Sequence, residues 1–151
     1  MAKDFVKILN LASSFRPCLV LTNATEPLQR RIKELIPLLE SKHAVSFRVS
    51  LDHYEELTHD LGRGEGNFSK ALVGLRILYD MGFNVSVARH ILPNEDDEVT
   101  EKAFKKLFKE YGLPEDLHMV AFPDFALPGS LPDVPYVTTN CMTEFQNPQS
   151  R

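Results

Sequence analysis

Side chains able to bind a polar ligand or to transfer protons follow each of the four short apolar runs in this chain of 151 residues. Carboxylate, amide, hydroxyl and basic groups recur at these positions. They are Thr22 and Asn23 after the first run, Ser50 and Asp52 after the second, Arg89 and His90 after the third, and Asp124 beyond the fourth. The edge at the carboxyl ends of the strands is where α/β proteins bind ligands. Turns also favour Asn, Asp and Ser, but four coincident ends favour a ligand site over that alternative.

A glycine-containing loop supplies a second candidate. Residues 60–68 read Asp-Leu-Gly-Arg-Gly-Glu-Gly-Asn-Phe, with three glycines around Arg63, and they differ from a Walker phosphate loop. Glycine lets a backbone approach a ligand, free amides at a helix start attract anions, and an arginine can clamp a carboxylate. The alternative is a flexible loop, capped by Asn67, with a solvated arginine, and spacing alone favours neither.

The elements that position these groups follow from the spacing of apolar residues. Apolar positions at helical spacing alternate with short runs typical of strands, and Gly or Pro often ends an element. We predict helices over 5–12, 25–39 (capped by Thr25 and kinked at Pro37), 67–81 and, after a turn at 93–97, up to 111. We predict strands over 18–21, 44–51, 83–92 and 118–122, and a loop over 52–66. This order predicts an α/β fold, with helices long enough to connect parallel strands.

The two faces of the predicted strands differ in polarity. In the second strand the period of two places Phe47, Val49 and Leu51 on one face and Arg48, Ser50 and Asp52 on the other. The third strand separates Val85 and Val87 from Asn84, Ser86 and His90 in the same way. Burying such polar groups dry costs about 1–3 kcal/mol each. We therefore expect parallel βα units that form part of an open barrel around a polar ligand and water. An amphipathic sheet with one solvated face is the alternative, more typical of antiparallel sheets.

Composition excludes several classes of protein. The net charge of −4 comes from interspersed acids and bases, which disfavours nucleic acid and anionic membranes as partners. No apolar run approaches the roughly 18–20 residues needed to cross a bilayer, and the first residues do not resemble a signal peptide, so we expect a cytoplasmic protein. Cys18 and Cys141 are too few and too far apart for a disulfide scaffold or a local metal site, and both are expected to be reduced.

Four blocks of residues together resemble the radical S-adenosylmethionine (radical SAM) superfamily. They are Leu-Thr-Asn-Ala-Thr at 21–25, Phe-Arg-Val-Ser-Leu-Asp-His at 47–53, His-Asp-Leu-Gly-Arg-Gly-Glu-Gly-Asn-Phe at 59–68 and Leu-Tyr-Asp-Met-Gly-Phe-Asn-Val-Ser-Val at 78–87. The likeness covers about residues 5–129. In members with cysteine-rich C-terminal extensions, similar blocks form the third to fifth strands of a six-stranded partial TIM-type barrel, with the loop and helix after the fourth.

The resemblance implies a chemistry and a set of roles. A [4Fe–4S] cluster, supplied with electrons by a reductant, cleaves SAM to methionine and a 5′-deoxyadenosyl radical that abstracts hydrogen from a substrate, here of unknown identity. By position, Ser50 and Asp52 resemble residues that contact the ribose or the methionine part of SAM. Arg63 would reach the SAM carboxylate, and Asn23 matches the end of the third strand, nearer the lumen. These four are the cofactor-binding residues that the resemblance implies.

The sequence departs from the family in two motifs. The Cys-x3-Cys-x2-Cys loop after the first strand and the Gly-Gly-Glu type motif after the second are both missing, and both would lie upstream of Met1. A site-differentiated cluster needs three thiolates, so we predict no metal ligands in this chain and no SAM cleavage by it alone. The simplest explanation is a fragment of such an enzyme. Residues 138–145 resemble the start of a cysteine-rich extension in which Cys141 would be a first ligand, but a free thiol is favoured because no further cysteine follows.

The predicted organisation is a partial barrel over 1–129 and a proline-rich tail over 130–151. Two alternatives remain open. One is a segment of a different (β/α) barrel enzyme that uses Asp52, His53 or His90 as acid–base groups. The other is a cluster-free SAM-binding or interaction module. We expect three further histidines, His43, His59 and His118, to be structural or solvated.

Overall fold

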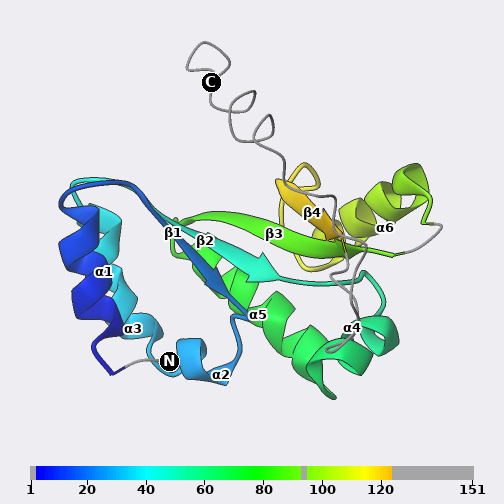
Figure 1. The fold of residues 1–151 in the computed structure, drawn as a ribbon, viewed down its shortest axis with the longest axis horizontal. Coiled ribbons are helices and arrows are strands. Elements are labelled where there is room, and N and C mark those ends of the chain that lie inside the picture. The colour runs from blue at the N-terminus through cyan, green and yellow to red at the C-terminus, as the bar shows by residue number, and fades with distance from the viewer. Residues whose placement is uncertain (1–2, 93–94, 124–151) are drawn as a thin grey trace, which may run out of the picture.

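The computed structural model describes residues 3–92 and 95–123 as an α/β fold with one four-stranded parallel sheet (Figure 1). The elements are α1 (Phe5–Ser13), β1 (Cys18–Thr22), α2 (Glu26–Gln29), α3 (Ile32–Leu35), η1 (Ile36–Glu40), β2 (Val45–Ser50), α4 (Glu56–Arg63), α5 (Asn67–Asp80), β3 (Asn84–Ile91), α6 (Asp97–Glu110) and β4 (Met119–Pro123). The strands are ordered β1-β2-β3-β4, and all neighbours are parallel. The predicted α/β class and the four strands are confirmed, with strand ends that differ by at most one residue.

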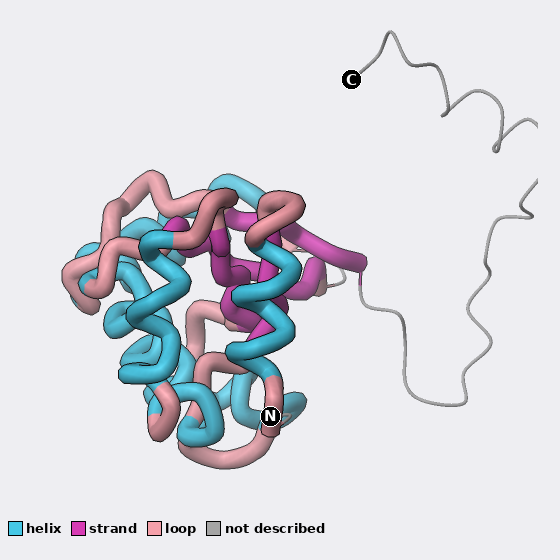
Figure 2. The backbone as a smooth tube through the Cα atoms, turned by 90° about the vertical axis from the view of Figure 1, so that its left-hand side faces the viewer, coloured by secondary structure: helices cyan, strands magenta, loops and turns pink. Residues whose placement is uncertain are grey.

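Helices cover one face of the sheet. Figure 2 shows most of the helical tube gathered on one side of the strands. The register places Phe47 beside Val20 and Val85, and Val49 beside Val87, on the covered face. Phe47, Val49 and Val87 are fully buried there, with the apolar residues of α5 and α6 packed in the same core. Side chains of this size contribute about 1.5–3 kcal/mol each on burial, which fixes the face that the helices cover.

The opposite face of the sheet is open. Residues of β2 alternate strictly, since Phe47 and Val49 are buried whereas Arg48 and Ser50 are only half-buried. The predicted division of β2 into an apolar and a polar face is therefore confirmed. On β1, at one edge of the sheet, Leu19 and Leu21 are 51% and 69% exposed on this open face. The sheet thus presents polar central strands beside an apolar edge.

Two predicted segments are wrong. Residues 52–66, predicted as a loop, contain α4. The predicted single helix over 25–39 is three short pieces, α2, α3 and η1, because the chain leaves helical geometry at Arg31 and tightens at Pro37. Thr25 precedes α2 in extended geometry, but its side chain makes no capping hydrogen bond. The predicted tail, Asp124 and Cys141 all lie outside the described residues.

The described helices include none long and apolar enough to cross a membrane.

Candidate functional site

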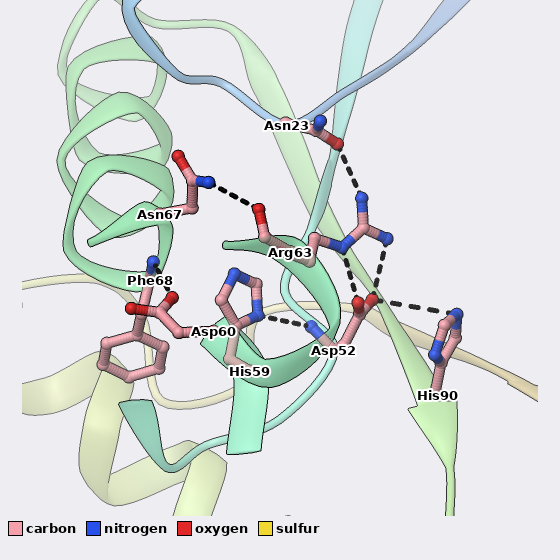
Figure 3. Close-up of polar contacts among 8 residues, drawn as sticks. All are labelled: Asn23, Asp52, His59, Asp60, Arg63, Asn67, Phe68 and His90. Atoms are coloured by element: carbon pink, nitrogen blue, oxygen red, sulfur yellow. Dashed lines mark hydrogen bonds and ion pairs between the residues drawn. The ribbon is translucent and has the colours of Figure 1, made fainter. Parts of the chain in front are cut away.

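An arginine–aspartate pair joins three elements at the carboxyl edge of the sheet (Figure 3). Arg63, the last residue of α4, donates from Nε and Nη2 to the two carboxylate oxygens of Asp52, at 2.5 and 2.9 Å. Its Nη1 donates to Asn23 Oδ1, just beyond β1, at 2.8 Å. The arginine and aspartate side chains are 25% and 15% exposed. This bidentate, charge-assisted pair at the rim brings together three of the four residues predicted to bind a cofactor.

A tight turn between α4 and α5 fixes the position of Arg63. Asp60 accepts hydrogen bonds from the amides of Gly66 and Phe68, at 2.6 and 2.8 Å, so its carboxylate lies at the start of α5. Gly66 has a φ of 74°, which favours glycine. Asn67 Nδ2 donates to the Arg63 carbonyl at 2.5 Å. The loop is therefore built around Asp60 rather than flexible and capped by Asn67, and two of the amides predicted to attract an anion are already used by Asp60.

The turn after β1 is held against α5 and positions Asn23. Gln29 Nε2 donates to the carbonyl of Ala24 at 2.8 Å and to that of Lys70, in α5, at 2.9 Å. Ala24 is fully buried and has a φ of 53°, unusual for a residue other than glycine. It lies so close to Gly74 that a Cβ at that glycine would be 2.0 Å from the Ala24 oxygen. The absence of a side chain at Gly74 therefore allows the turn to pack against α5.

His59 lies beneath the ion pair and is 1% exposed. Its Nδ1 accepts the amide hydrogen of Asp52 at 3.1 Å, so a neutral ring carries its proton on Nε2. Burial lowers the pKa of His59 below 6.5, and the nearby charge of Asp52 offsets this only in part. Nε2 has no hydrogen-bond partner among the described residues. We expected a structural or solvated histidine, and its burial agrees with the structural alternative, but no pattern in the sequence signals the buried donor at Nε2.

A small polar pocket of about 90 Å³ lies at this site. Its lining includes Asn23, Ser50, His59, Arg63 and Asn67. All four predicted residues therefore converge, since Asn23, Ser50 and Arg63 line the pocket and Asp52 is bound to Arg63. The pocket offers hydrogen-bond donors to one small oxygen-bearing group or to a few water molecules.

The end of β3 contributes one predicted residue to the site and not the other. His90 Nε2 lies 3.8 Å from Asp52 Oδ1, on the open face. Arg89 instead points to the covered face, where it is 7% exposed and paired with Glu95 and Asp97. The period of two along a strand requires neighbours to take opposite faces, so these two residues could not both join the site. Thr22 likewise turns inward, and its hydroxyl accepts from the Ala24 amide at 3.0 Å.

The donor set does not fit an iron–sulfur cluster. A site-differentiated cluster needs at least three thiolates, and the chain has two cysteines, Cys18 and Cys141. Within residues 3–92 and 95–123 no group of three His, Cys, Asp or Glu side chains is arranged to hold a metal ion. No chemical step of a cluster is therefore assigned to the described residues.

The fold and the site define an α/β protein whose open parallel sheet has a polar site at the carboxyl edge. No protein-family model and no curated protein sequence matches the chain.

Proposed function

We propose that this chain is the SAM-binding wall of a cytoplasmic radical SAM enzyme with a partial TIM-type barrel. Residues 1–129 would bind SAM without cleaving it, and the cluster thiolates and the electrons from a reductant would come from outside this chain. The single observation that supports this most directly is the convergence of Asn23, Ser50, Asp52 and Arg63 at the carboxyl edge of an open parallel sheet. The resemblance of four sequence blocks to the superfamily supplies the identity of the ligand.

The groups at the rim suit the functional groups of SAM. The Asp52 carboxylate is an acceptor for ribose hydroxyls or for the ammonium group of the methionine part. Arg63 uses three of its five N–H groups on Asp52 and Asn23, which leaves two for a carboxylate. His59 adds a buried donor at Nε2. The 90 Å³ pocket accommodates one terminal group of such a ligand, and the remainder would lie along the open face of the sheet.

The test is calorimetric titration of the chain with SAM, comparing Asp52→Asn with Asp80→Asn. Asp80 is a matched control because it forms a similar pair with Arg76, whose Nε lies 2.8 and 2.7 Å from its two oxygens, away from the site. Loss of a charged acceptor is worth about 1.5–3 kcal/mol, so Asp52→Asn should weaken SAM binding about tenfold or more. Asp80→Asn should leave it unchanged. Absence of SAM binding by the unmodified chain, or equal weakening by both variants, would contradict the proposal.

A second candidate is an acid–base enzyme built on a different (β/α) barrel, and the 3.8 Å approach of His90 to Asp52 favours it. A carboxylate beside an imidazole is a usual arrangement for proton transfer. His53 does not contribute, since its Nδ1 accepts the Glu55 amide at 3.0 Å and its ring stacks on Tyr54. If the chain does not bind SAM, hydrolysis of a nitrophenyl ester by chelator-treated protein, lost in His90→Gln, would support this candidate instead.

A further inference from the structure

Arg48 occupies the middle of the open face of the sheet. It lies in β2, an interior strand, beside Leu21 of β1 and Ser86 of β3. Its Nε donates to Ser86 Oγ at 3.2 Å, which fixes the guanidinium against the sheet. The side chain is half-buried. Four N–H groups of the guanidinium therefore remain for another acceptor at a defined place on the sheet.

Arg48 differs from the other arginines in its charge partners. Within the described residues, four arginines have a carboxylate partner: Arg31 with Glu34, Arg63 with Asp52, Arg76 with Asp80 and Arg89 with Glu95. Arg16 and Arg30 are exposed to solvent. Arg48 is half-buried, and no described carboxylate forms an ion pair with it. A partly desolvated cation without a counter-ion is costly, so this position favours an anionic ligand.

A groove of about 380 Å³ runs beside Arg48 towards the amino ends of the strands. Its lining includes Leu19, Ser46, Asn84 and Ser86. The lining of this groove shares no residue with the lining of the pocket at the carboxyl edge, so the two are separate.

We infer that this groove binds the single carboxylate of a small amphipathic molecule, with Arg48 as its charge partner. One guanidinium matches one negative charge, and the other polar side chains that line the groove include Ser46, Asn84, Ser86 and His118. With Nε used on Ser86, the two Nη atoms present a fork that fits the two oxygens of a carboxylate. The exposed Leu19 beside it offers apolar surface to the rest of the ligand. This inference is independent of the proposed binding of SAM.

The experiment is a ¹H–¹⁵N NMR titration of the whole chain with hexanoate, and with hexanamide as a neutral isostere, at constant ionic strength. Saturable shifts are expected for hexanoate at the Arg48 Nε–H, the Ser86 amide and the Asn84 side-chain amide, and none for hexanamide. Arg48→Gln should weaken binding about tenfold or more, since it keeps a donor for Ser86 but removes the charge. Spectral dispersion of each variant verifies that it is folded.

Asp52→Asn is the control that separates the two sites. It should leave hexanoate binding within about twofold of the unmodified chain while weakening SAM binding. Arg48→Lys, which keeps the charge without the fork, should bind hexanoate with intermediate affinity. Equal shifts with hexanamide, shifts that do not saturate, or saturable shifts centred on Arg63 and Asn23 would overturn the assignment to Arg48. Failure of SAM binding alone would leave it standing.

Discussion

Substitution of Gly74 by alanine tests whether the turn before α2 packs closely against α5. Gly74 lies within α5, where helix propensity alone predicts that alanine stabilises the protein by about 0.8–1 kcal/mol. The structure predicts the reverse. A Cβ added there would lie 2.0 Å from the Ala24 oxygen and 2.7 Å from the Ala24 Cβ. Normal carbon–oxygen contacts are about 3.3 Å or longer, so the turn would move by more than about 1 Å.

The size of the effect follows from the contacts that such a movement disturbs. Forcing a methyl group into a packed site costs about 1–3 kcal/mol. Displacement of the Ala24 carbonyl from Gln29 Nε2, now at 2.8 Å, costs about 1 kcal/mol more. The gain in helix propensity offsets about 1 kcal/mol of this. Gly74→Ala should therefore lower the free energy of unfolding by about 1–3 kcal/mol, and it should also weaken ligand binding because Asn23 belongs to the same turn.

Urea denaturation followed by circular dichroism measures this change, and Gly62→Ala is the matched control. Gly62 is also a helical glycine, in α4, but nothing lies within 4 Å of a Cβ built on it. Its substitution should leave stability unchanged or raise it by up to about 1 kcal/mol. If Gly74→Ala raises stability as Gly62→Ala does, the turn does not pack closely against α5. The conclusion that this packing positions Asn23 would then be wrong.

Two further predictions concern buried ionisable groups. Burial lowers the pKa of His59 below 6.5 in the folded protein, so His59 takes up a proton more readily in the unfolded chain. The contribution of neutral His59 to stability is therefore complete above pH 6.5 and should diminish as the pH falls below 6.5. Urea denaturation at several pH values should show that His59→Gln removes this part of the pH dependence, whereas His118→Gln, at an exposed site, keeps it. Burial raises the pKa of Glu95, but hydrogen bonds from the Leu92 amide and Thr100 and the charge of Arg89 outweigh it, so the net pKa is lowered. Glu95 and Arg89 side chains are both 9% exposed, so Glu95→Gln should cost about 2–4 kcal/mol in the same assay at neutral pH. Asp97→Asn should cost less than about 1 kcal/mol, because the Asp97 side chain is 87% exposed and screened by solvent; equal losses in the two variants would contradict the difference in burial.

The strands could be predicted from the sequence because their burial is regular. In β2 the alternation of Phe47 and Val49 with Arg48 and Ser50 matches the observed faces residue by residue. Prediction of α4 failed because its large apolar residues, Leu57 and Leu61, are 83% and 88% exposed. Periodicity identifies helices by a stripe directed at the core, and here that stripe is absent.

The candidate site was predicted only in part for a similar reason. Asn23 and Asp52 follow strands and Ser50 ends one, so the rule that ligands bind at carboxyl edges locates them. The pairing of Arg63 with Asp52 depends on where α4 ends, which local patterns do not determine. His59 was missed as a site residue because its burial arises from contacts with Asp52 and Phe68 that form only after α4 has packed.

The unprotected edge of β1 affects how readily molecules of this protein associate with one another. It is an edge strand with the sequence Cys-Leu-Val-Leu-Thr, without a lysine or proline to discourage pairing with another chain. Leu19 and Leu21 add exposed apolar surface along the same rim. Uncharged, β-prone edges of this kind act as templates for strand addition, so crowding of molecules promotes their association. We therefore expect the rate at which the protein aggregates to depend more on its concentration than on temperature.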